Sequence, residues 1–166
     1  LARFPPEPPA GPQAYLRALA ERRGGDIEGV YRSVAGVIGS GEDEIALLDN
    51  ATRAWDMAFY SIPFRQGDRI LTTSTEYGAN FIAYLQVARR TGAVIEVVPD
   101  AAGGEIDVDA LAEMIDDRVK LISMNHMPTN GGLLNPAAAV GRIARDAGVP
   151  FLLDACQTVG QMPLDV

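Results

Sequence analysis

Short apolar runs alternate with segments of helical periodicity along the 166-residue chain. Runs rich in Ile, Leu and Val predict buried strands, and apolar positions spaced three and four apart predict amphipathic helices. Strands are expected at residues 44–50, 68–74, 93–99, 119–126 and 150–155. Helices are expected at residues 13–23, 26–39, 52–62, 79–92, 107–115 and 136–148. This alternation predicts an α/β fold with a mostly parallel sheet and helices on both faces.

Polar or glycine-containing segments follow four of the five predicted strands. They read DNAT, STEYGAN, NHMPTNGG and DACQ, and begin at residues 49, 74, 125 and 154. In open parallel sheets, ligands bind beyond the carboxyl ends of the strands, so these segments are expected to line one site. Asp154 is then expected in that site and not in the core, where an unpaired charge would cost several kcal/mol.

Charge and composition exclude several classes of function. The formal net charge of −8 disfavours nucleic acid and anionic membranes as partners, because both require a basic surface. A single cysteine, Cys156, rules out an internal disulfide, and with a single histidine, His126, the chain lacks the ligands of a structural zinc site. No apolar run approaches the length of a membrane span.

Two segments carry candidate binding chemistry. Asp154 is either the N-cap of a following helix or a carboxylate that pairs with a buried cation, such as the protonated ring nitrogen of pyridoxal phosphate, with Gln157 as a donor beside it. The residues alone leave both roles open. Ala51 and Thr52 lie where a helix begins, and the free N–H groups there attract phosphate. Taken alone, Thr52 is more simply a helix cap.

Other candidates also have simpler structural explanations. Tyr77 either stacks on a flat ring or packs beneath the end of the sheet, and Thr129 lies in a glycine-containing turn. His126 is expected to be a packed histidine, Cys156 a small buried residue, and Trp55 part of the core.

In combination, the segments NAT, EYGAN, NHMPTNGGLLNP and LLDACQTVGQMPLDV resemble the class V aminotransferase group of fold-type-I pyridoxal-phosphate enzymes. This group includes cysteine desulfurases, hercynylcysteine sulfoxide lyases and isopenicillin N epimerase-like proteins. The resemblance covers roughly residues 26–166. It implies that Asp154 pairs with the pyridine nitrogen and that Gln157 hydrogen-bonds the phenolic oxygen of the cofactor.

The resemblance also implies roles for the remaining candidates. Ala51 and Thr52 would hold the phosphate, Tyr77 would stack on the ring, and Thr129 would lie near the cofactor oxygen and the substrate. Members of the group are typically cytoplasmic homodimers that act on small amino-acid substrates, with active sites at the subunit interface, so the same is expected here.

In this family the lysine that binds the cofactor covalently lies beyond the DACQ segment and is not within these 166 residues. Lys120, the sole lysine, opens a strand at the end opposite the expected site. The chain is therefore expected to be a piece of a longer protein and inactive by itself. Residues 1–25 would form an N-terminal segment with a helix, and residues 26–166 the first portion of the cofactor-binding large domain.

The leading functional hypothesis is a pyridoxal-phosphate enzyme that cleaves a C–S bond in an amino acid or a cysteine conjugate. The alternatives within the family are a class V aminotransferase and an isopenicillin N epimerase-like enzyme. A nucleotide-binding reductase is disfavoured because DNATRA, after the first predicted strand, lacks glycine. A non-catalytic interaction domain is the remaining, more remote alternative.

Overall fold

The computed structural model describes residues 29–166, which divide into two compact units. One consists of residues 29–46 and 162–166, and the other of residues 47–161. The helix predicted at residues 13–23 and the segment 1–25 lie outside the described residues. No helix within residues 29–166 is both long and apolar enough to cross a membrane.

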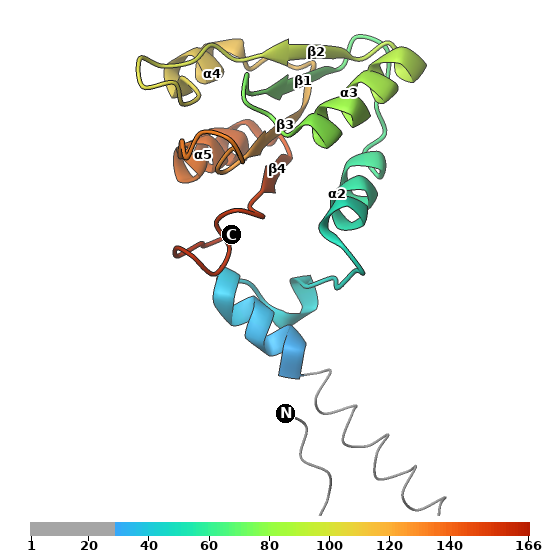
Figure 1. The fold of residues 1–166 in the computed structure, drawn as a ribbon. Helices are drawn as coiled ribbons and strands as arrows, with labels where there is room; N and C mark the ends of the chain where they lie inside the picture. Colours follow the sequence, from blue (N-terminus) through green and yellow to red (C-terminus); the bar gives the residue numbers. More distant parts are fainter. Residues whose placement is uncertain (1–28) are drawn as a thin grey trace, which may run out of the picture. The chain divides into compact units, whose positions relative to one another are not determined.

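A parallel four-stranded sheet forms the centre of the larger unit (Figure 1). Its strands are β1 (Arg69–Thr72), β2 (Val94–Val97), β3 (Val119–Asn125) and β4 (Phe151–Asp154). The strand order is β2-β1-β3-β4, and every neighbouring pair is parallel. All four carboxyl ends therefore lie at one edge of the sheet. In the register, Asn125 lies opposite Asp154 at that edge.

Helices cover both faces of this sheet, as the sequence predicted. They are α2 (Ala51–Tyr60), α3 (Gly78–Thr91), α4 (Val108–Met114) and α5 (Ala137–Ala147). Figure 1 shows α2 and α3 on one face and α4 and α5 on the other. Strand residues alternate between the two cores: Ile70 packs with the side chains of α2 and α3, and Leu71 packs with those of α4 and α5. This alternation is the period-2 geometry of a strand that is buried on both sides.

The strand predicted at residues 44–50 is wrong. Glu42–Glu44 form a short 3-10 helix, η1, and residues 45–50 have no strand neighbour in the described part of the chain. Leu47 is 46% exposed, so the apolar run is not buried as a core strand would be. A short apolar run has the same composition in an extended link as in a strand, and only a hydrogen-bonded partner distinguishes them.

The smaller unit is built around a helix at residues 29–38, which falls within the helix predicted at residues 26–39. Gly39 follows it with φ of 75°, a left-handed conformation that favours glycine. The backbone N–H of Val166 donates to the carbonyl oxygen of Ile38 at 3.1 Å, which ties residues 162–166 to this helix.

A buried arginine at the amino end of β1 links this strand to β2 and to the segment before β3. The Arg69 guanidinium pairs with Glu96 through two nitrogens, and its Nη1 lies 3.1 Å from Asp116 and donates to the carbonyl oxygen of Met114 at 2.7 Å. The Arg69 partner lowers the pKa of Glu96, and Arg118, with Arg69 adding to it, lowers the pKa of Asp116 to about 2. This cluster fixes β1, β2 and the end of α4 together.

We expect the Arg69→Met variant to be less stable than the wild type at pH 7. Loss of the guanidinium bonds to Glu96 and to the Met114 carbonyl should lower the free energy of unfolding by about 2 kcal/mol. Because Arg69 lowers the pKa of Glu96 in the folded state, the part of this stabilisation that comes from the Glu96 charge is present above the ordinary pKa of a glutamate, about 4.3, and is lost as the pH falls below it. Urea unfolding of both proteins from pH 7 to pH 2.5 measures the difference, and a pH-independent difference would contradict this account.

Candidate active site

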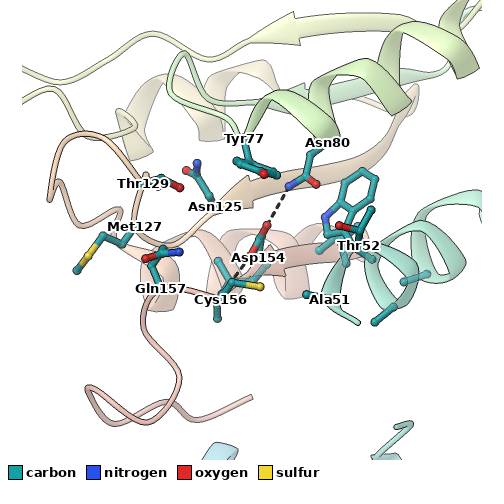
Figure 2. A pocket seen from close by; sticks show the side chains of 16 residues that line it. Ala51, Thr52, Tyr77, Asn80, Asn125, Met127, Thr129, Asp154, Cys156 and Gln157 are labelled. Atoms are coloured by element: carbon teal, nitrogen blue, oxygen red, sulfur yellow. Dashed lines mark hydrogen bonds between the residues drawn. The ribbon is translucent and has the colours of Figure 1, made fainter. Parts of the chain in front are cut away.

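A pocket of about 520 Å³ opens at the carboxyl edge of the sheet (Figure 2). All six residues that the sequence selected line it: Ala51, Thr52, Tyr77, Thr129, Asp154 and Gln157. They come from the start of α2, the loop before α3, the loop after β3, the last residue of β4 and the turn that follows it. The four polar segments therefore meet at one site, including the first segment, although no strand precedes it.

The N-terminus of α2 forms one wall of the pocket. Asn50 is the N-cap, since its Oδ1 accepts a hydrogen bond from the backbone N–H of Arg53 at 2.9 Å. Thr52 is therefore not the cap, contrary to the simpler interpretation of the sequence, and its side chain is exposed. The first N–H groups of a helix have no partner within the helix, so those of Ala51 and Thr52 can receive an anion.

Asp154 ends β4 and lies between the start of α2 and the loop after β3 in Figure 2. Its Oδ2 accepts a hydrogen bond from Asn80 Nδ2 at 3.0 Å, and its Oδ1 accepts one from the backbone N–H of Cys156 at 3.1 Å. A turn, and not an α-helix, follows it, so the helix-cap interpretation is wrong. The carboxylate is held from both sides at the half-buried edge of the pocket.

His126 anchors the turn that carries Gln157. His126 Nδ1 lies within hydrogen-bond distance of Thr158 Oγ1, at 2.9 Å, and the same Thr158 hydroxyl lies 3.2 Å from the carbonyl oxygen of Ala155. Both side chains are buried, and burial lowers the pKa of His126. His126 is thus a packed, neutral histidine, as predicted, and it fixes the segment between Asp154 and Thr158.

Two buried polar atoms of pocket-lining residues lack hydrogen-bond partners within the described chain. They are the indole nitrogen of Trp55 and Oδ1 of Asn125. Trp55 also belongs to the core, as predicted, because its ring stacks on Phe59 at 4.8 Å between centroids. Unpaired buried polar atoms are rare in folded proteins, so their presence here fits a site that receives a polar ligand.

Cys156 does not have the properties of a nucleophile. It is exposed, contrary to the prediction of a buried residue. Partial desolvation and the neighbouring Asp154 carboxylate raise the pKa of its thiol to about 11. The thiol therefore stays protonated near neutral pH, and the thiolate is the reactive form.

Asn80, Asn125 and Met127 also line the pocket. They lie in the polar segments expected there, but no individual role was predicted for them. Asn80 lies three residues after Tyr77, a helical spacing that places both side chains on one side of the α3 start. The spacing from Tyr77 could therefore have indicated Asn80 as a pocket residue from the sequence. The position of Asn125 opposite Asp154 depends on the strand register, which the sequence does not specify.

Comparison with known proteins agrees with this geometry. The family model for class-V aminotransferases matches residues 14–166. The chain belongs to the class-V aminotransferase family. A probable cysteine desulfurase of Methanothermobacter thermautotrophicus is 30% identical over 156 residues, which cover 94% of this chain and 38% of that protein. The family resemblance inferred from the sequence is thereby confirmed.

Solved structures share the fold. An apo cysteine desulfurase from Thermococcus onnurineus superposes with a TM-score of 0.78 at 26% identity, covering 84% of this chain and 35% of that one. A C-DES mutant with glycine covalently linked to its pyridoxal-phosphate cofactor has a TM-score of 0.76 at 24% identity, covering 95% of this chain and 41% of that one. The chain thus spans less than half the length of these relatives. The fold-type-I large-domain architecture predicted from the sequence is confirmed.

Proposed function

We propose that the complete protein is a pyridoxal-phosphate enzyme that cleaves a C–S bond in cysteine or a cysteine conjugate. One observation carries this proposal: a single pocket brings together a fixed carboxylate, Asp154, and the N-terminus of a ten-residue helix, α2. Such a pocket suits a ligand with a cationic ring nitrogen at one end and a phosphate at the other. Pyridoxal phosphate has both groups.

The residues present fit this cofactor. Asp154 would hold the protonated ring nitrogen, and Ala51 and Thr52 would bind the phosphate through backbone N–H groups and the Thr52 hydroxyl. Tyr77, which is 50% exposed on the pocket wall, would cover one face of the ring. Gln157 and Thr129 would donate to the oxygen substituent of the ring.

When bound, pyridoxal phosphate acts as an electron sink for the bonds at the α-carbon of an amino acid. The residues of this chain would keep the cofactor ring protonated and correctly placed. Asp154 would retain the proton on the ring nitrogen, and the His126–Thr158 hydrogen bond would keep Gln157 in place beside the cofactor. The turn after β4 and the start of α2 would bind opposite ends of the cofactor.

C–S chemistry is favoured over transamination and epimerisation because the relatives described above are named as cysteine desulfurases. The test is to incubate the protein, expressed from its complete reading frame, with cysteine and with cystine and to measure released sulfide. Sulfide release that requires pyridoxal phosphate supports the proposal. Conversion of amino donors to 2-oxo acids without loss of sulfur would favour an aminotransferase, and racemised substrate would favour an epimerase.

We expect Thr52→Ala to weaken binding of the phosphate group specifically. Loss of one hydroxyl donor to a charged phosphate costs about 1.5 kcal/mol, which corresponds to about a tenfold higher Kd for pyridoxal phosphate. Titration calorimetry with pyridoxal, which lacks the phosphate, is the control and should give the same Kd for the variant and the wild type. If the Thr52→Ala variant lost affinity for pyridoxal and for pyridoxal phosphate to a similar extent, Thr52 would not be a specific contact of the phosphate.

We also infer a cytoplasmic homodimer, with residues 26–166 as the first portion of the cofactor-binding domain and residues 1–25 as a separate N-terminal segment. Exposed apolar side chains on adjacent helices support a protein interface: Met57 and Tyr60 on α2, and Ile82 and Leu85 on α3. The net charge of −8 supports the absence of nucleic acid from the partners. Light scattering of the complete protein measures its mass, and a monomer at micromolar concentration would contradict the dimer.

A further inference from the structure

A second carboxylate, Glu76, lies behind Asp154 and is joined to it by one amide group. Asn80 Nδ2 donates to Asp154 Oδ2 at 3.0 Å and to Glu76 Oε1 at 3.1 Å. The amide nitrogen carries two hydrogens, so it can serve both carboxylates at once. Asn80 is only 5% exposed, which leaves this bridge shielded from water. Figure 2 shows the Asn80 side chain directed at Asp154.

Glu76 is itself surrounded by donors. The backbone N–H of Tyr77 donates to Oε1 at 2.7 Å, while the hydroxyls of Tyr84 and Thr72 lie 3.2 Å and 3.4 Å from Oε2. Tyr84 is fully buried and also lies 2.8 Å from Ser123 Oγ in the centre of the sheet. Since a hydroxyl has one hydrogen, Tyr84 can donate to Glu76 while it accepts from Ser123.

These contacts favour an ionised Glu76, whereas its burial opposes ionisation. Burial is the largest influence and raises the pKa of Glu76, the hydrogen bonds from Tyr77, Asn80 and Tyr84 oppose that rise, and the negative charge of Asp154 adds to it. The titratable groups facing Glu76 are Tyr84 from α3 and Asp154 from β4. Burial raises the pKa of Tyr84 well above its usual range, so it remains a neutral donor.

We propose that Glu76 and Asn80 are positioning residues for Asp154. Asn80 fixes the orientation of the Asp154 carboxylate, and Glu76 adds a second negative charge behind it. A protonated heteroaromatic nitrogen that pairs with Asp154 therefore keeps its proton to higher pH than it would beside Asp154 alone. The identity of that nitrogen as the ring nitrogen of pyridoxal phosphate rests on the proposed function.

The coupling has to be reciprocal, because each group changes the free energy of charging the other. Since the charge of Asp154 raises the pKa of Glu76, replacing Asp154 with asparagine should lower the pKa of Glu76. A cation bound beside Asp154 should also lower the pKa of Glu76. Conversely, neutralising Glu76 should make the cation easier to deprotonate.

The test follows two NMR signals in the complete protein. The first is the nitrogen resonance of ¹⁵N-labelled pyridoxal phosphate, titrated with pH in the wild type and in Glu76→Gln. The glutamine keeps an oxygen that accepts from Tyr77 and Asn80, and its amide can donate to the Tyr84 and Thr72 hydroxyls. We expect the midpoint of ring deprotonation to fall by about one pH unit in this variant.

Asp100→Asn is the matched control. Asp100 lies after β2 near the same edge of the sheet, and its carboxylate accepts from Ser74 Oγ at 2.7 Å and 2.8 Å. Within residues 29–166, Asn80 and Asp154 are not among its hydrogen-bond partners. The Asp100→Asn substitution removes one negative charge, as Glu76→Gln does. The midpoint of ring deprotonation in this variant should match that of the wild type. In a protein that also carries Asn80→Ala, Glu76→Gln should lower the midpoint of ring deprotonation by less, because the amide that joins Glu76 to Asp154 is then absent. Equal midpoints in the wild type and Glu76→Gln would overturn the proposal.

The second signal needs no cofactor. The ¹³C carboxyl resonance of Glu76 is titrated in the ligand-free wild type and in Asp154→Asn, and its midpoint should fall in the variant. An unchanged midpoint would overturn the coupling even if the protein binds pyridoxal phosphate. If the protein does not bind pyridoxal phosphate, the proposed function fails, while a lowered midpoint would still support the coupling between the two carboxylates.

Discussion

Replacing Asp154 with asparagine is expected to reduce kcat/KM of the complete enzyme by about 30-fold to about 5,000-fold. Removing one member of a buried, hydrogen-bonded charge pair costs about 2 to 5 kcal/mol, and each 1.4 kcal/mol corresponds to a factor of ten. The carboxylate oxygens both accept hydrogen bonds, from Asn80 and from the Cys156 backbone. Asparagine has one acceptor oxygen, so one of these donors would also face an amide nitrogen.

Steady-state kinetics with saturating pyridoxal phosphate measure this loss, and Asp100→Asn serves as the control for general loss of negative charge. The control should retain activity within about twofold, because surface substitutions usually change free energies by less than about 0.5 kcal/mol. An Asp154→Asn enzyme with wild-type kcat/KM would show that Asp154 does not pair with the reacting cofactor.

Phe59→Ala is expected to lower the free energy of unfolding by about 3 to 5 kcal/mol, the range found for aromatic residues truncated in a core. Phe59 is fully buried at the centre of an aromatic cluster. Its ring lies 4.8 Å from that of Trp55, 5.3 Å from that of Tyr84 and 5.6 Å from that of Phe64. These contacts hold α2 against the sheet, so the variant should also bind pyridoxal phosphate more weakly.

Urea unfolding followed by far-UV circular dichroism measures the change in stability. Arg53→Ala is the matched control, because Arg53 lies on the same helix but its side chain is 64% exposed. It should change the free energy of unfolding by less than about 0.5 kcal/mol. Equal losses in the two variants would contradict the role assigned to the aromatic cluster.

Much of this architecture could be predicted because local patterns and chain order agree. The strands β1 to β4 are short apolar runs between periodic helices, and each lies within a predicted range. The six predicted site residues converge because parallel strands bring their carboxyl ends to one edge. Gly148 ends α5 with φ of 66°, as expected of a glycine after a helix.

The remaining features depend on contacts distant in the sequence. Residues 44–50 resemble a strand, but strand formation requires a hydrogen-bonded neighbour, which local composition does not specify. Glu76 appeared as one acid in a polar loop, and its burial depends on Thr72, Asn80 and Tyr84 surrounding it. Its connection to Asp154 spans from α3 to β4 and could not be inferred from spacing.

The most direct test of the account is the visible absorption spectrum of the complete protein with pyridoxal phosphate, recorded before and after borohydride treatment. We predict a yellow band that borohydride bleaches, with an altered position in Asp154→Ala, because Asp154 would hold the proton on the ring nitrogen. A protein that stays colourless when pyridoxal phosphate is added would contradict the proposed site, as would a band unchanged in Asp154→Ala.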